Sequence, residues 1–228
     1  LDTGKELVPL MSLSEKADLL EYIAKECDLE KEDILSYDLY TFVMDAPVFV
    51  GTDSSLVASP RLDNLTSVAA LQEGIKKCDA MPDNTIDMMV VFDNEEVGSK
   101  SFQGADSDFL LLTVKKIAAG LNMDEQTFSG MLSRSMVVSA DNAHALHPGY
   151  TEKADTNNRP VINEGIVIKK NSSLKYTTDG FSEAFFKKIC KNAGIPVQMF
   201  ANRSDIAGGS TLGNISISHM SVHTVDIG

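Results

Sequence analysis

The chain has 228 residues, of which 43% are hydrophobic and 23% are charged, and it contains no low-complexity run. This composition excludes a peptide module and a disordered chain, and it predicts a folded protein with a sizeable core. The 20 basic and 33 acidic side chains give a formal net charge of −13, which argues against nucleic acid and anionic membrane surfaces as partners.

The two ends of the chain bear on its location and completeness. The first six residues carry neither the basic nor the apolar region of a secretory signal. No apolar run approaches the roughly 18 residues of a membrane-spanning helix, so we expect a cytoplasmic protein. The chain does not begin with Met and it stops directly after an apolar run that ends at Gly228, so we also expect a piece of a longer protein.

The first 60 residues predict mainly helical structure followed by strand. Ser12 and Glu15 have the spacing of a capping box, and apolar residues recur at helical spacing after them. Aromatic and β-branched residues around Pro47 favour strand. In chain order we expect a helix over 12–27, a short acidic helix over 30–35, one or two strands over 37–50 and a loop over 51–60.

Beyond residue 60, helical and strand patterns alternate along the chain. The expected helices cover 64–78, 104–121 and 181–193, and the expected strands cover 88–92, 135–140, 165–169, 197–201 and 222–227. Such alternation predicts an α/β fold with a mixed, largely parallel sheet covered by helices. In such folds the functional side chains lie beyond the carboxyl ends of the strands.

Acidic side chains occupy several of these expected positions. Asp63 comes just before a predicted helix, Glu95 and Glu96 follow the strand over 88–92, and Asp141 follows the strand over 135–140. If these strands are neighbours, the carboxylates converge. Converging anions are stable together when they are protonated or when a cation lies between them, and a divalent metal is the simplest such cation.

The four carboxylates suggest a division of roles. Asp63 could give one oxygen to each of two metal ions, with Glu96 and Asp141 as terminal ligands. Adjacent glutamates in a turn cannot both point the same way, so Glu95 could face the bridging water as general base. The alternative is that Asp63 and Asp141 are helix caps or surface residues, as single carboxylates commonly are.

Zinc sites of this kind normally take imidazole as well as carboxylate. The chain has four histidines: His144, His147, His219 and His223. Of these, His144 is three residues beyond Asp141, close enough to enter the same cavity, but the site remains short of ligands. Lys169 ends an apolar strand, and its ammonium could meet a substrate carboxylate at that edge or simply reach water.

Four motifs occur in order between about Pro60 and Gly228. They are Arg61-Leu62-Asp63-Asn64, the segment 93–99 with Glu95-Glu96-Val97-Gly98, the segment 139–148 with Asp141 and His144, and Asn158-Arg159-Pro160 leading to Val167-Ile168-Lys169. Together they resemble the aspartyl aminopeptidase and aminopeptidase I family of di-zinc metallopeptidases. The Glu-Glu-Val-Gly motif alone is less specific, because related di-zinc aminopeptidases share it.

The resemblance implies a metalloaminopeptidase that removes N-terminal residues, preferably Asp or Glu, from peptides with water activated by two zinc ions. It implies that Asp63 bridges the ions, that Glu96 and Asp141 are ligands, and that Glu95 is the general base. It further implies that Lys169 contacts the acidic side chain of the substrate. His144 would line the same substrate pocket.

The resemblance also implies a domain organisation. Residues 1–50 are expected to be the C-terminal part of an inserted dimerisation domain, and residues 51–228 an incomplete catalytic metallopeptidase domain, in a protein that forms a homo-oligomeric dodecamer. The two histidine ligands of the family would lie outside this chain. Two alternatives are a related di-zinc aminopeptidase of different specificity and a non-catalytic or inactive assembly fragment.

Overall fold

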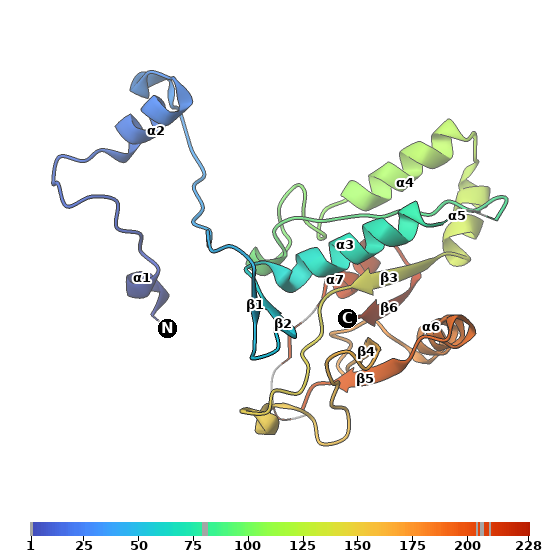
Figure 1. Ribbon diagram of the computed structural model, residues 1–228. Coiled ribbons are helices and arrows are strands. Elements are labelled where there is room, and N and C mark those ends of the chain that lie inside the picture. Colours follow the sequence, from blue (N-terminus) through green and yellow to red (C-terminus); the bar gives the residue numbers. More distant parts are fainter. Residues whose placement is uncertain (1, 79–81, 204, 206–207, 210) are drawn as a thin grey trace. The chain divides into compact units, whose positions relative to one another are not determined.

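The computed structural model describes residues 2–78, 82–203, 205, 208–209 and 211–228 (Figure 1). The chain divides into two compact units, Leu1–Pro60 and Arg61–Gly228. The assignment of residues 1–50 to a dimerisation domain and of 51–228 to a catalytic domain stays a prediction. In the described ranges, no helix is both long enough and apolar enough to cross a membrane.

The first unit contains short elements joined by extended backbone. They are α1 (Thr3–Glu6), α2 (Leu19–Cys27), the 3₁₀ turn η1 (Lys31–Asp33), β1 (Val48–Val50) and β2 (Leu56–Ala58). The two strands pair antiparallel as a hairpin, with Val48 opposite Ala58. The acidic helix predicted over 30–35 is therefore present as a single turn.

The helix predicted over 12–27 begins at Leu19, so the predicted capping box is wrong. The Asp18 carboxylate caps the helix instead, accepting hydrogen bonds from the backbone N–H groups of Leu20 at 2.9 Å and Glu21 at 3.2 Å. Lys31 forms an ion pair with the same carboxylate. The Ser12 hydroxyl accepts only a local bond from the backbone of Ser14, which closes a turn rather than opening a helix.

The strand and loop predictions over 37–60 are wrong in extent. Only β1 forms within 37–50, and the predicted loop over 51–60 contains β2. A strand needs a neighbour for its backbone hydrogen bonds, and the described part of this unit provides that neighbour only across the hairpin. The turn reverses at Gly51, whose φ of +92° is readily adopted by glycine.

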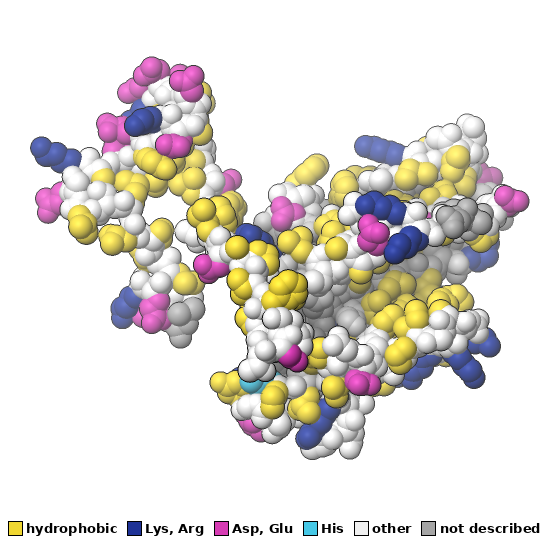
Figure 2. Space-filling model, viewed as in Figure 1, with side chains coloured by type: hydrophobic (Ala, Val, Ile, Leu, Met, Phe, Trp, Pro, Cys, Tyr) yellow, Lys and Arg dark blue, Asp and Glu magenta, His cyan; other side chains and the backbone are white. Residues whose placement is uncertain are grey.

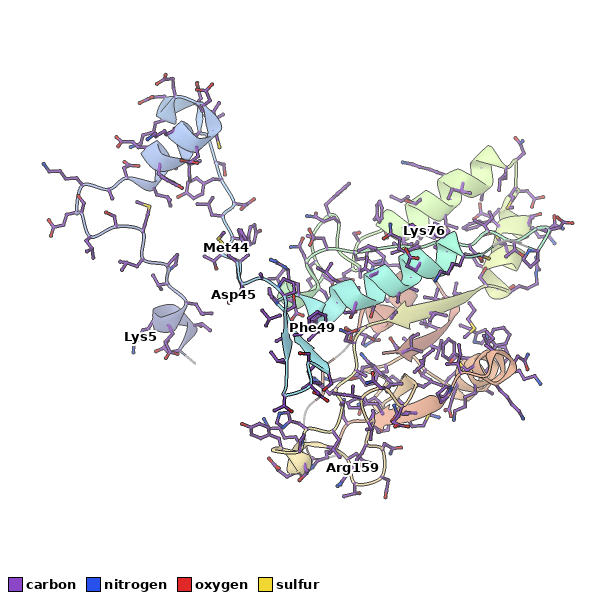
Figure 3. All side chains as sticks on the ribbon, viewed as in Figure 1. Lys5, Met44, Asp45, Phe49, Lys76 and Arg159 are labelled. Carbon is purple, nitrogen blue, oxygen red and sulfur yellow. The ribbon has the colours of Figure 1, made fainter. Side chains whose placement is uncertain are left out.

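The first unit leaves most of its large apolar side chains exposed, as the yellow atoms over residues 1–60 in Figure 2 illustrate. Met44 is 84% exposed and Phe49 is 74% exposed (Figure 3). Among its described hydrophobic residues, Ala24 alone is buried. A unit with so little core gains little stability from burial, and its exposed apolar surface is of the kind that another protein surface covers.

The second unit is an α/β fold. Its elements are α3 (Leu62–Lys76), η2 (Glu95–Val97), α4 (Phe109–Gly120), α5 (Glu125–Ser133), β3 (Met136–Ala140), η3 (Thr151–Lys153), β4 (Ile166–Lys170), α6 (Gly180–Ala193), β5 (Val197–Ala201), α7 (Leu212–His219) and β6 (His223–Ile227). The sheet has the order β3-β6-β4-β5, with β3 parallel to β6, β4 parallel to β5, and β4 antiparallel to β6. The predicted mixed, largely parallel sheet is confirmed.

Helices cover both faces of this sheet (Figure 1). The buried core cluster contains Ile168, Phe186, Cys190 and Val225, so α6 packs on the face formed by β4 and β6. Because side chains alternate along a strand, Lys169 and Asp226 face the opposite side, where α7 packs against β3 and β6. A Cβ on Gly213 of α7 would lie 2.6 Å from an Asp226 oxygen, which shows how closely the two approach.

The strands predicted over 135–140, 165–169, 197–201 and 222–227 are confirmed as β3 to β6. The helices predicted over 64–78 and 181–193 correspond to α3 and α6. Helix α6 begins at a capping box formed by Asp179 and Ser182 and ends at Gly194, whose φ is +69°.

The strand predicted over 88–92 is wrong. Met88 and Val91 are 40% and 56% exposed, and no described strand pairs with this segment. It runs instead into a loop, where the Asp93 N–H donates to the Gln103 carbonyl at 3.1 Å. Helix α4 starts at Phe109 rather than 104, and neither α5 nor α7 was predicted, although Asp124 caps α5 through the Thr127 N–H.

Candidate active site

Asp63 lies in the first turn of α3, where the backbone of Asp63 and Asn64 departs from helical geometry. Two asparagine side chains attach this turn to the end of β3. The Asn64 amide donates to the Ala140 carbonyl at 2.8 Å, and the Asn142 amide donates to the Leu62 carbonyl at 3.0 Å. The start of α3 and the end of β3 are therefore joined from both sides.

Glu95 and Glu96 lie in the tight turn η2. Asn94 and Gly98 on either side have φ values of +61° and +101°, and the Gly98 N–H donates to the Glu95 carbonyl at 2.8 Å. The Ser99 N–H closes the turn further by donating to the Asn94 carbonyl at 2.9 Å. Glu95 is half-buried whereas Glu96 is exposed, so the two neighbouring carboxylates have different surroundings.

Lys169 brings a positive charge to the same place. Its Nζ lies 2.8 Å from Asp141 Oδ2 and donates to the Asn142 carbonyl at 3.0 Å. It also lies 5.7 Å from the ring centroid of Tyr176. The side chain is only 3% exposed, so its ammonium does not simply reach water. Lys169 is a buried cation paired with the strand-end aspartate.

The acidic groups influence one another. Loss of hydration, the charge of Asp141 and a hydrogen bond with that carboxyl group raise the pKa of Asp63. Loss of hydration, followed by the charges of Asp141, Glu96 and Asp63, raises the pKa of Glu95 to about 7. Lys169 opposes both shifts. The structure thus brings together all four carboxylates that the sequence singled out.

His144 is not drawn into this cluster. It is exposed, and it forms no hydrogen bond or ion pair with another described residue. His147 instead accepts a hydrogen bond from the Gly149 N–H at 3.0 Å, and the His219 ring lies 3.1 Å from both Asp106 and Asp108. The groups in the cluster that could ligate a metal ion are therefore carboxylates.

The cluster fits a divalent metal in charge and in donor type. If all four carboxylates are ionised beside one ammonium, three negative charges are uncompensated, and a divalent cation would reduce this excess. As the described side chains stand, no group of three His, Cys, Asp or Glu is arranged to hold a metal ion. Because zinc generally takes imidazole or thiolate as well, these carboxylates would form only part of a zinc coordination shell.

Sequence reasoning missed the residues that hold the carboxylates in place. Asn64 and Asn142 each follow an aspartate of the cluster directly, so the repeated Asp-Asn pair was the available signal. Tyr176 had no such signal in the sequence, because only the folded chain brings its ring close to Lys169. Burial raises the pKa of Tyr176.

The mixed sheet and the strand-end carboxylates define an α/β protein with a candidate metal-dependent hydrolase site. The family model described as aminopeptidase I zinc metalloprotease (M18) matches residues 4–228. The chain belongs to this family.

Similar proteins agree with the family. A probable M18 family aminopeptidase 2 of Clostridium novyi (strain NT) is 43% identical over 233 residues, covering 100% of this chain and 53% of the relative. The cryo-EM structure of the Ape4 and Nbr1 complex matches with a TM-score of 0.79 and 30% identity, covering 99% of this chain and 45% of that chain. The S. cerevesiae mApe1 dodecamer matches with a TM-score of 0.73 and 26% identity, covering 92% and 47%. The chain spans about half the length of the curated relatives it matches.

Proposed function

We propose that this chain supplies the carboxylate part of the active site of an aminopeptidase that removes N-terminal residues, preferably Asp or Glu, from peptides. The observation that carries the proposal is the gathering of four carboxylates and Lys169 around the end of β3, supported by the ion pair between Lys169 and Asp141 and by the electrostatic influence of the acidic groups on one another. The M18 names of the relatives support the reaction class. We further propose that the enzyme works in the cytoplasm.

In this proposal Asp63, Glu96 and Asp141 hold two zinc ions, and histidines outside this chain complete the coordination. When bound, zinc polarises the scissile carbonyl and lowers the pKa of bound water. The carboxylate oxygens of the cluster support this role because they carry uncompensated charge and lie within electrostatic reach of one another.

Glu95 moves the proton. A half-buried carboxylate beside the proposed metal ligands can accept a proton from water and return it to the leaving amine. Its half-buried position in the turn η2 keeps it beside Asp63 and Asp141 without an ion pair of its own among the described residues. Glu95 is thus the proposed general base and general acid.

The test of this proposal is the zinc content and activity of two proteins: this chain, and a version extended at both ends to the length of its relatives. Zinc bound at full occupancy with peptidase activity in the extended form supports the proposal. If neither form binds zinc, the proposal is rejected in favour of a non-catalytic assembly fragment. Zinc-dependent activity with no preference for acidic residues, measured on a panel of aminoacyl anilides, would point to a related aminopeptidase of different specificity.

Lys169 is the proposed contact for the acidic side chain of the substrate, with His144 lining the same pocket. We expect Lys169→Ala to lower kcat/KM for Asp substrates about 10-fold to 100-fold more than for neutral ones, because losing the ion pair with Asp141 affects every substrate whereas the pairing with a substrate carboxylate is lost only with the acidic one. Aspartyl and leucyl anilides measure this ratio. Lys170→Ala is the matched control, since Lys170 pairs with Glu183 and is half exposed. Equal losses on both substrates would remove Lys169 from the specificity pocket.

We also propose that residues 1–50 belong to the inserted dimerisation domain and that the protein forms a homo-oligomer, with a dodecamer as the expected state. Support comes from the exposed apolar side chains of the first unit and from the dodecamer described for mApe1. The mass of the extended protein in solution, measured by light scattering, decides the oligomeric state.

A further inference from the structure

Among the described residues, the Asn142 side chain forms its hydrogen bonds with the start of α3. Its Oδ1 accepts from Thr66 Oγ1 at 2.9 Å and from Ser67 Oγ at 3.1 Å, and its Nδ2 donates to the Leu62 carbonyl at 3.0 Å. Asn142 lies more than 70 residues further along the chain, so these contacts join segments that only the fold brings together.

Other contacts extend this link to the remaining parts of the site. Asn64, next to Asp63, donates to the Ala140 carbonyl at 2.8 Å, next to Asp141. The backbone carbonyl of Asn142 accepts the ammonium of Lys169 at 3.0 Å. Hydrogen bonds therefore connect the residues that flank Asp63 with the residues that flank Asp141. Asn142 also connects this network to the buried Lys169 through its carbonyl group.

An amide suits this position chemically. Asp63 and Asp141 carry like charges, and their repulsion tends to separate the two segments that bear them. The Asn amide offers two donors and an acceptor, so it can bond both the Leu62 carbonyl and the hydroxyls of Thr66 and Ser67 without adding charge. A carboxylate in the same place could not donate to the carbonyl and would add to the repulsion.

We propose that Asn142 is a positioning residue that, together with Asn64, sets the separation of Asp63 and Asp141 and thereby the affinity of these carboxylates for their metal ion. Among the described residues the Asn142 side chain bonds to α3 and to none of the carboxylates, so its effect on the metal passes through the positions of the two aspartates. The inference rests on the proposed function, because it concerns the metal held by the same carboxylates.

The test is the zinc affinity of the protein extended to the length of its relatives, measured by competition with a chromophoric chelator. We expect Asn142→Ala to weaken zinc binding about 10-fold to 100-fold, the range found when outer partners of metal ligands are removed. Gln198→Ala is the matched control. The Gln198 amide also makes three hydrogen bonds, to Val161 at 2.8 and 3.0 Å and to Gly165 at 3.2 Å, but none to the cluster. It should lower the Tm without changing the zinc affinity.

The variant Asp141→Asn distinguishes a failure of the proposed function from a failure of the positioning role of Asn142. If Asp141→Asn binds zinc as tightly as the unaltered protein, the proposed function fails and this inference fails with it. If Asp141→Asn loses zinc while Asn142→Ala keeps the full affinity, the positioning role is wrong and the proposed function stands.

A second variant covers the case in which Asn142→Ala does not fold. Replacing Thr66 and Ser67 together by Ala removes the two hydroxyl groups that donate to Asn142. The hydrogen bond from Thr66 is exposed to solvent and the one from Ser67 is partly buried. We expect this pair to weaken zinc binding several-fold with a small change in Tm. An unchanged zinc affinity in this pair overturns the positioning role.

Discussion

Replacing Glu95 by Gln is expected to abolish peptide hydrolysis while leaving the zinc content of the extended protein nearly unchanged. The amide keeps the shape of the side chain but cannot accept the proton of the attacking water. General base catalysis typically contributes about 10²-fold to 10⁴-fold, so a loss of at least that size is expected in kcat. Turnover of an aspartyl anilide and metal analysis of the same sample measure both quantities.

The neighbouring glutamate provides the control. Glu96→Gln removes a proposed ligand rather than the base, so zinc content and activity should fall together. The two variants change adjacent residues of one turn by the same chemistry, which makes their difference informative. Undiminished turnover in Glu95→Gln rejects the general base. A loss of zinc in Glu95→Gln as large as that in Glu96→Gln would make Glu95 a ligand instead.

Replacing Asp226 by Ala is expected to lower the free energy of unfolding more than the other substitutions considered for this protein. The Asp226 carboxylate is fully buried, and it accepts hydrogen bonds from the Thr177 N–H at 2.6 Å, the Thr177 hydroxyl at 2.7 Å and the Thr211 hydroxyl at 2.5 Å. Its removal leaves these donors without their acceptor and a gap beside Gly213. Each buried donor left without an acceptor costs about 1 to 3 kcal/mol, and a total loss of about 3 to 5 kcal/mol lowers the Tm by roughly 10 °C in a chain of this size.

Asp124→Ala is the comparison for this prediction. Asp124 also accepts a backbone hydrogen bond, from Thr127 at 2.7 Å, but it lies at an exposed helix start. A lost cap of this type costs about 1 kcal/mol. Thermal unfolding followed by circular dichroism measures both variants. Similar small shifts for the two would show that the buried network around Asp226 contributes no more than a surface cap.

The strands β3 to β6 could be predicted because each is a five-residue segment whose apolar side chains belong to or pack against the buried core cluster. The helix α6 could be predicted because its capping residues and Gly194 act within a few positions of one another. The segment 88–92 has the same apolar character as the true strands, yet it forms none, because the described sheet offers it no partner for its backbone hydrogen bonds. The capping box at Ser12 failed because Asp18 competes for the same role.

In the candidate site, too, some residues could be predicted from the sequence and others could not. Asp63, Glu95, Glu96 and Asp141 could be chosen from the sequence because they stand at the ends of predicted elements. The asparagines that fix two of these carboxylates could not be chosen from any helix or strand pattern, because each bonds to a segment far away in the chain. For His144, nearness to Asp141 in the chain suggests a place in the substrate pocket, and this stays a prediction.

The sequence by itself determined which carboxylates are present and that the motifs are those of the M18 family. Only the tertiary structure decided which of these groups meet. Lys169 reaches Asp141 because β4 and β3 lie on either side of β6, and this strand order depends on how buried faces pack between distant segments. Local patterns carry no information on that packing, whereas the charge and apolar character of each residue are present before the chain folds.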